Sequence, residues 1–209
     1  MSETPQVAEN NENEVPTSRR VLVFCASSQS ADPVFRESAA DLGRRLAQSG
    51  RTVVYGGGSL GSMGALADAA LAEGGKVVGI QPRFMAEREW THKGLSELHL
   101  VESMAERKNL MVASCDAVVT LPGGSGTFEE VFEVITAKRL GLFLGPIVFV
   151  NQRDFFHHCL AQLNQCVEQN FMDQRHLSMW SVVESAAGVI DAMAAAAAWS
   201  EDAVEFAAI

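Results

Sequence analysis

Residues 116–130 read DAVVTLPGGSGTFEE, and this stretch determines which architecture we expect for the chain. Its first part, Asp116–Leu121, is a short apolar run that predicts a buried strand. Pro122, Gly123 and Gly124 end that strand, and the following residues predict a helix to about Leu140. A buried strand that passes through glycines into a helix is one βα unit, and repetition of this unit builds a parallel sheet.

The same unit recurs on both sides of this stretch. Further apolar runs predict strands at Val21–Cys25, Thr52–Tyr55, Lys76–Ile80, Leu98–Val101, Pro146–Val150 and Trp180–Val183. Helical patterns cover about Pro33–Ser49, Gly61–Glu73 and Met104–Cys115. Strands that alternate with helices predict an α/β fold: a doubly wound, mostly parallel sheet with helices on both faces, Rossmann-like and in a single domain. Ligands of such sheets bind beyond the carboxyl ends of the strands, so the loops that leave strands are the informative ones.

Length and charge narrow the classes of function. Residues 1–18 are polar and acidic and predict a disordered tail, which leaves 19–209 as the single Rossmann-like domain. The formal net charge is −10, so no nucleic-acid partner is expected, because a phosphate backbone needs a clustered basic face. A small anionic ligand stays compatible with this charge, since local N–H groups and one or two basic side chains outweigh a distant field.

The cysteines indicate the compartment. All four are interpreted as free and buried, because none belongs to a CxxC pair: Cys25, Cys115, Cys159 and Cys166. Free cysteines fit a reducing compartment, and no stretch reaches the roughly 18 apolar residues that a membrane helix needs. We therefore expect a cytoplasmic protein with no membrane partner. The histidines have no ligand spacing, so neither a metal site nor another cofactor is predicted.

Three of the predicted strand-exit loops consist of small residues. They are Ala26-Ser27-Ser28, Gly56-Gly57-Gly58-Ser59 and Gly123-Gly124-Ser125-Gly126-Thr127. Glycine lets the backbone approach a ligand closely, and a helix that begins there offers unpaired N–H groups to an anion. A tight turn explains any single loop as well as phosphate binding does, but three on one sheet edge favour a phosphate pocket.

Candidate reactive side chains lie close to the third loop. Glu130 follows Thr127 by three residues, so the two side chains can share a helix face. A carboxylate beside a sugar suits glycoside cleavage, because the transition state has oxocarbenium character. Arg107 and Lys108 lie on the helix that precedes the strand Asp116–Leu121. Such a pair usually belongs to a solvated face, but its place in the topology favours contact with a phosphate.

Taken together, these motifs resemble those of the LOG family, the cytokinin riboside 5′-monophosphate phosphoribohydrolases. Pro122–Glu130 resembles the family signature PGGxGTxxE, and Ser103–Lys108 resembles the upstream MxxRK element. The segment YGGGSLGSMG, from Tyr55 to Gly64, is similar to the family's YGGGxxGLMG loop, and VVGIQPRF is similar to its VxGIxPxx strand. The resemblance extends in order from about Val21 to Val150.

Several expectations follow from this resemblance. It implies that Arg107 and Glu130 are catalytic and that the loop from Gly123 to Thr127 holds the phosphate. It implies that three further residues contact the nucleotide: Glu89, Lys108 and Thr136. The implied reaction is hydrolysis of the N-glycosidic bond of an adenine-type nucleoside 5′-monophosphate, AMP or N6-substituted AMP, to free base and ribose 5-phosphate without a cofactor. The resemblance also implies a homodimer or a larger homo-oligomer.

One segment departs from the family pattern. Where the family has TWxQLGxHxKP, residues 136–146 read TAKRLGLFLGP, and this difference bears on base recognition and on the oligomer surface. The alternative function is a nucleotide-binding sensor or carrier on the same fold, which would need the loop but not the carboxylate of Glu130. The Walker and GxGxxG spacings are missing, which argues against a phosphotransferase or a dinucleotide-dependent enzyme. Chains of this kind have also been described as lysine decarboxylases, but no lysine here is set out to anchor pyridoxal phosphate.

Overall fold

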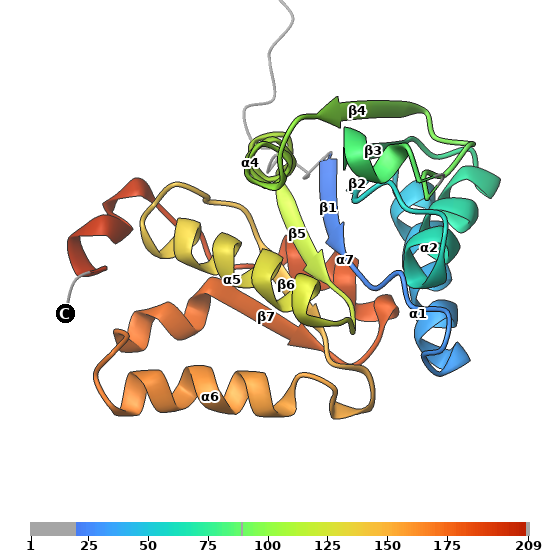
Figure 1. The fold of residues 1–209 in the computed structure, drawn as a ribbon. Helices are drawn as coiled ribbons and strands as arrows, with labels where there is room; N and C mark the ends of the chain where they lie inside the picture. Colours follow the sequence, from blue (N-terminus) through green and yellow to red (C-terminus); the bar gives the residue numbers. More distant parts are fainter. Residues whose placement is uncertain (1–19, 89, 208–209) are drawn as a thin grey trace, which may run out of the picture.

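The computed structural model describes residues 20–88 and 90–207. The predicted tail, residues 1–18, and the predicted nucleotide contact Glu89 lie outside the described residues. Within the described residues, seven strands form one sheet in the order β4-β3-β2-β1-β5-β6-β7 (Figure 1). All six neighbouring pairs are parallel, which confirms the predicted sheet.

Apolar runs form the strands, as the sequence indicates. The strands are β1 (Arg20–Phe24), β2 (Thr52–Tyr55), β3 (Val77–Pro82), β4 (Glu97–Val101), β5 (Ala117–Thr120), β6 (Ile147–Val150) and β7 (Trp180–Val183). The central strands are almost fully buried, since a parallel sheet is covered on both faces. Edge strand β4 differs, because four of its five residues are exposed.

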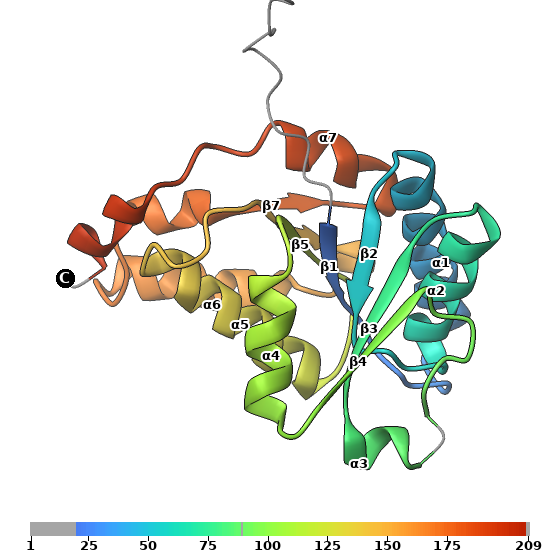
Figure 2. The same ribbon diagram turned by 90° about the horizontal axis from the view of Figure 1, so that it is seen from above.

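Helices cover both faces of the sheet, which confirms the doubly wound architecture (Figure 2). One layer contains α1 (Pro33–Gln48), α2 (Gly61–Ala72) and α7 (Val189–Ala194), whose apolar side chains form one core cluster with the sheet. The other contains α4 (Met104–Ala113), α5 (Ser125–Arg139) and α6 (His157–Glu168), which form a second core cluster. None of the helices in the described part of the chain is long and apolar enough to cross a membrane.

The helices begin at the predicted residues Pro33, Gly61 and Met104, whereas their C-terminal ends come one or two residues earlier than predicted. Helix α4 ends at Ala113 rather than Cys115, and β3 continues to Pro82 rather than ending at Ile80. The sequence interpretation missed the short helix α3 (Arg83–Ala86). After Val150, where helical segments were expected up to the C-terminus, the described residues form four 3-10 segments besides α6 and α7: η1 (Gln152–Asp154), η2 (Gln174–Met179), η3 (Ala186–Gly188) and η4 (Glu201–Phe206).

The strand order reverses at the centre of the sheet. Strands β1 and β5 are neighbours, yet α1 follows β1 on one face and α5 follows β5 on the other. Ligands of doubly wound sheets bind at such a point, outside the carboxyl ends of the strands. The loops that follow β1 and β5 are therefore where a site is expected.

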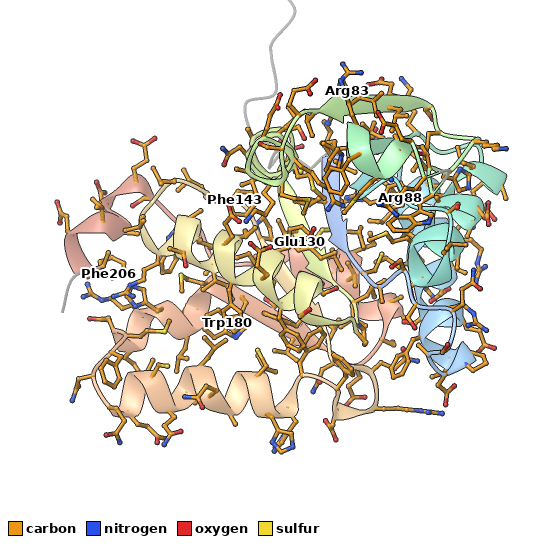
Figure 3. The ribbon with its side chains drawn as sticks, in the orientation of Figure 1. Arg83, Arg88, Glu130, Phe143, Trp180 and Phe206 are labelled. Atoms are coloured by element: carbon orange, nitrogen blue, oxygen red, sulfur yellow. The ribbon has the colours of Figure 1, made fainter. Side chains whose placement is uncertain are left out.

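A C-terminal segment packs far from this point. After α7 the chain crosses to the C-terminal end of α5, and Figure 3 places Phe206 at that end of the molecule. Trp199 Nε1 donates a hydrogen bond to the Lys138 carbonyl at 2.7 Å. Lys138 is 2% exposed, and its ammonium group donates to the Gly145 carbonyl at 2.6 Å. This segment fixes the end of α5 opposite the strand-exit loops.

Candidate active site

The loop between β5 and α5 offers an open helix N-terminus. Gly124 is the N-cap of α5, and Gly124, Ser125 and Gly126 are all exposed. Thr127 is 4% exposed and faces inward. A methyl group at Gly123 would overlap Thr127 Oγ1, so glycine is what lets the threonine hydroxyl occupy that place. Free N–H groups and the positive end of the helix dipole make this surface suitable for an anion.

Arg107 is buried at the carboxyl ends of two strands. It lies on α4, whose N-terminus is capped by Ser103 Oγ accepting from the Glu106 N–H at 3.1 Å. Its guanidinium donates to the Ile80 carbonyl at 3.1 Å and to the Gly56 carbonyl at 3.4 Å. At 5% exposure the side chain is not part of a solvated face. The side chain is held rigidly by backbone acceptors, with one guanidinium nitrogen, Nη1, directed to other partners.

Glu130 lies against Arg107. The Glu130 carboxylate is 3.6 Å from Arg107 Nη1, and both side chains are less than one-tenth exposed. Burial raises the pKa of Glu130 to about 7, although the Arg107 charge acts in the opposite direction. The structure therefore brings the two predicted catalytic residues together in the interior of the molecule, where Figure 3 labels Glu130. Carboxylates whose pKa is raised by burial are frequent in active sites, because they can exchange protons near neutral pH.

Lys108 is neutralised by two carboxylates on α5. Its ammonium group pairs with Glu129 and, at 2.6 Å, with Glu133. The hydrogen bonds to Glu129 and Glu133 raise the pKa of Lys108. The sequence interpretation did not identify Glu133 as part of this site. Its spacing of four from Glu129 was the available signal, because residues four apart share one helix face.

The other small-residue loops border the same pair. Gly57 adopts a left-handed conformation (φ 77°) and is buried, and a methyl group at the adjacent Gly56 would overlap the Arg107 guanidinium. Ser27, in the loop after β1, is exposed. Cys25, directly after β1, is buried, and its burial together with the Glu130 charge raises the pKa of its thiol. The predicted loops after β1 and β2 thus lie beside the Arg107–Glu130 pair. The other three cysteines are free as predicted, but they are half-buried rather than buried.

The segment 90–92, directly after the predicted nucleotide contact Glu89, folds over the second loop. The Ser59 N–H donates to the Trp90 carbonyl, and the His92 N–H donates to the Gly57 carbonyl, each at 2.9 Å. Gly58 and Thr91 form an antiparallel bridge. No local pattern signals this contact, because it joins residues about thirty positions apart.

Thr136 lies elsewhere on α5. It is exposed, six residues beyond Glu130, and its hydroxyl donates to the Phe132 carbonyl at 2.8 Å. The structure does not bring it to the Arg107–Glu130 pair of the same chain. It shares an exposed face with Phe132 and Leu140, which lie four residues before and after it.

Comparison with known proteins identifies relatives over most of the chain. Residues 63–193 match the family model described as "Possible lysine decarboxylase". A cytokinin riboside 5′-monophosphate phosphoribohydrolase of Rhodococcoides fascians is 40% identical over 179 residues, which cover 85% of this chain and 90% of that protein. A phosphoribohydrolase of the same name from Arabidopsis thaliana is 38% identical over 154 residues, or 74% of this chain and 72% of the relative.

Solved structures share the fold at lower identity. The molybdenum cofactor carrier protein of Chlamydomonas reinhardtii superimposes with a TM-score of 0.65 at 20% identity, covering 83% of this chain and 94% of that one. The molybdenum cofactor binding protein of Rippkaea orientalis gives a TM-score of 0.61 at 20% identity, covering 82% and 93%. At this identity the likeness concerns the fold alone, since one fold supports many functions. The family model and the relatives near 40% identity are more specific, and by them the chain belongs to the LOG family of phosphoribohydrolases, which are hydrolases.

Proposed function

We propose that this protein hydrolyses the N-glycosidic bond of an adenine-type nucleoside 5′-monophosphate, releasing the free base and ribose 5-phosphate. The observation that carries the proposal is the buried Arg107–Glu130 pair beside the open N-terminus of α5. A site that only bound nucleotide would use the helix N-terminus, but it would gain nothing from a buried carboxylate next to the sugar.

Phosphate recognition follows from the loop geometry. The exposed backbone of Gly124 to Gly126 and the hydroxyl of Thr127 surround the positive end of α5. A 5′-phosphate bound there would receive charge-assisted hydrogen bonds. Lys108 carries two carboxylate partners already, so its contribution to phosphate binding requires that it leave one of them. The phosphate anchor fixes the ribose, and the fixed ribose brings C1′ toward Glu130.

Glu130 and Arg107 have different roles in the proposed reaction. As the bond between C1′ and the base nitrogen breaks, C1′ acquires positive charge, which the ionised Glu130 carboxylate stabilises. Glu130 also orients the water whose oxygen bonds to C1′, and the proton released from that water ends on the departing base. Arg107 positions the substrate and favours the negative charge that develops on the leaving base. Such preorganised charges lower a barrier by several kcal/mol, about 3 kcal/mol for a single group.

The adenine-type base and the cytokinin class are the finer part of the proposal. Relatives named for cytokinin riboside 5′-monophosphate support it. Residues 136–146, where the chain departs from the family pattern, are where a different base preference would originate. A plain purine and an N6-substituted purine are therefore compared directly in the experiment below.

We also propose that the protein works as a homodimer or a larger homo-oligomer. Phe132 on α5 and Leu140 at its C-cap are 38% and 40% exposed, and Leu142, just beyond the helix, is 77% exposed. Exposed apolar side chains that gather on and just after one helix are typical of a subunit interface. A second copy packed on this face would cover Thr136 as well. The cytoplasmic location stays a prediction from the sequence.

The test is base release, measured by chromatography with purified protein. The substrates are AMP, an N6-prenylated AMP, GMP and CMP, each beside its nucleoside. We expect free base from adenine-type monophosphates and none from the nucleosides, because nucleosides lack the phosphate anchor. Nucleotide that binds without release of any base would contradict the proposal and favour a sensor or carrier.

A further inference from the structure

The loop between β6 and α6 contains two consecutive residues in a costly conformation. Arg153 (φ 53°) and Asp154 (φ 56°) both adopt the left-handed region, although neither is glycine. A side chain crowds the backbone there, so the conformation persists only where the surroundings enforce it. An enforced conformation of this kind next to a ligand-binding edge points to a functional constraint.

Asn151 enforces the conformation of this loop. Its backbone N–H donates to the Val183 carbonyl of β7 at 2.7 Å, which ties the loop to the edge of the sheet. Its side-chain oxygen accepts from the Phe156 N–H at 2.7 Å, and its side-chain nitrogen donates to Asp154 Oδ1 at 3.3 Å. The side-chain amide thus bonds to two later residues of the loop, while the backbone of Asn151 bonds to the sheet. These three hydrogen bonds hold the loop in place.

Through Arg153 the loop holds the start of α1. Arg153 Nη1 donates to Asp32 Oδ2 at 2.7 Å, across 121 residues of sequence. The other oxygen of Asp32 accepts from the Val34 N–H at 3.0 Å and so caps α1. The hydrogen bond from the Val34 N–H and, to a smaller extent, the one from Arg153 hold the pKa of the Asp32 carboxyl below its ordinary value. The loop after β1, which contains Ser27, ends at this cap.

Through Phe155 the same loop contacts the start of α5. The Phe155 ring stacks on Phe128 with 6.2 Å between centroids and meets Phe35 of α1 edge-on at 6.0 Å. Phe128 directly follows Thr127 in the predicted phosphate loop. Phe155 therefore stands between the first turns of α1 and α5, at the point where the strand order reverses.

We propose that the loop Asn151–Phe156 positions the phosphate site, with Arg153 and Phe155 setting the distance between the first turns of α1 and α5. The inference rests on the proposed function, in which the substrate phosphate binds at the N-terminus of α5. Arg153 and Phe155 are positioning residues, since their contacts are with Asp32, Phe35 and Phe128.

This arrangement predicts a selective effect on kinetics. Arg107 is held by α4 and by the carbonyls of Gly56 and Ile80, none of which belongs to the loop, and Glu130, although it lies on α5, is buried against Arg107. Loosening the loop should weaken phosphate binding and leave the chemical step nearly intact. KM for the monophosphate should rise while kcat changes little.

The experiment compares Arg153→Ala and Phe155→Leu with the wild-type protein. The control is Arg45→Ala, which removes an ion pair of similar length (2.8 Å, to Asp41) within α1 that does not reach another loop. Arg153→Ala should raise KM and the inhibition constant of ribose 5-phosphate about two- to fivefold, the range for an exposed ion pair. The inhibition constant of free adenine should stay unchanged, because the base does not use the phosphate site. Equal losses of affinity for adenine and ribose 5-phosphate, or no change in either, would overturn the inference.

A double-mutant cycle with Asp32→Asn isolates the Arg153–Asp32 ion pair, since asparagine retains the helix cap but loses the charge. The double variant should match each single variant, and additive effects would contradict a direct Arg153–Asp32 mechanism. Calorimetric titration with ribose 5-phosphate separates this inference from the proposed function. If the wild-type protein binds ribose 5-phosphate but releases no base, the function fails and the titrations still decide the role of the loop. If it binds no ribose 5-phosphate, the inference fails too, because no phosphate site exists for the loop to position.

Discussion

Replacing Glu130 with glutamine is expected to abolish turnover and to stabilise the protein above neutral pH. Glutamine keeps the size of the side chain but removes its charge. Both effects have one cause: the ionised carboxylate is 7% exposed, so the fold bears the cost of its desolvation while the reaction uses its charge. A residue that served only to hold the fold would lower stability when replaced.

The magnitude follows from the pKa. Burial raises the pKa of Glu130 from an ordinary 4.5 to about 7. The folded protein therefore holds an additional proton between these values, and the resulting stability, full below pH 4.5, is lost as pH rises through 7. A shift of this size corresponds to about 3 kcal/mol. Glu130→Gln stays neutral and lacks this decline, so it should melt higher than the wild type at pH 8, by about 6–12 °C.

The assay combines thermal melts with turnover at pH 5 to 8. Wild-type kcat/KM should rise about tenfold between pH 6 and pH 8, as the ionised fraction of a group with pKa near 7 grows from one-tenth to nine-tenths. Glu102→Gln serves as control, because Glu102 is 73% exposed and its loss should change neither profile. Melting temperatures of wild type and Glu130→Gln that run parallel across this range would refute the reasoning, as would full turnover in the variant.

Three further predictions concern other parts of the molecule. Gly123→Ala should displace the Thr127 hydroxyl and raise KM for monophosphates about tenfold or more, because a hydrogen bond to a charged group is lost. Initial rates measure this change. Phe132→Asp should shift the protein to monomer in light scattering if α5 forms the subunit interface, and an unchanged mass would contradict the oligomer proposal. Burial lowers the pKa of Lys138 to about 8, so wild-type stability should rise as pH increases from 8 to 10.5, whereas melts of Lys138→Met should show no such rise.

The sheet and its layers could be predicted from the sequence because local patterns encode them. The apolar run Ala117–Thr120 is buried whatever its neighbours are, and glycines at 123 and 124 end it before α5. The exposed strand β4 was still predicted as a strand at Leu98–Val101, since leucines alternate with polar residues in its sequence, ELHLV. A helix as short as α3, with four residues, is too short to show the periodic spacing of apolar residues by which a helix is recognised in a sequence.

The site was predictable only in part. Local patterns indicated an anion-binding loop, whereas the catalytic roles of Arg107 and Glu130 were implied by the family resemblance. Their direct contact, at 3.6 Å, is a finding of the structure. The carboxylate partners of Lys108 and the placement of Phe155 depend on how distant segments pack. The spacing of Glu129 and Glu133 shows that they share a helix face, but no local pattern shows which distant side chain packs against that face, because packing between elements has no sequence period.

The most direct test of the account is to follow AMP by proton NMR in the presence of purified protein. Cleavage of the N-glycosidic bond predicts loss of the AMP anomeric signal with equal amounts of adenine and ribose 5-phosphate. Formation of adenosine and inorganic phosphate, or an unchanged spectrum at a protein concentration that binds AMP, would contradict it.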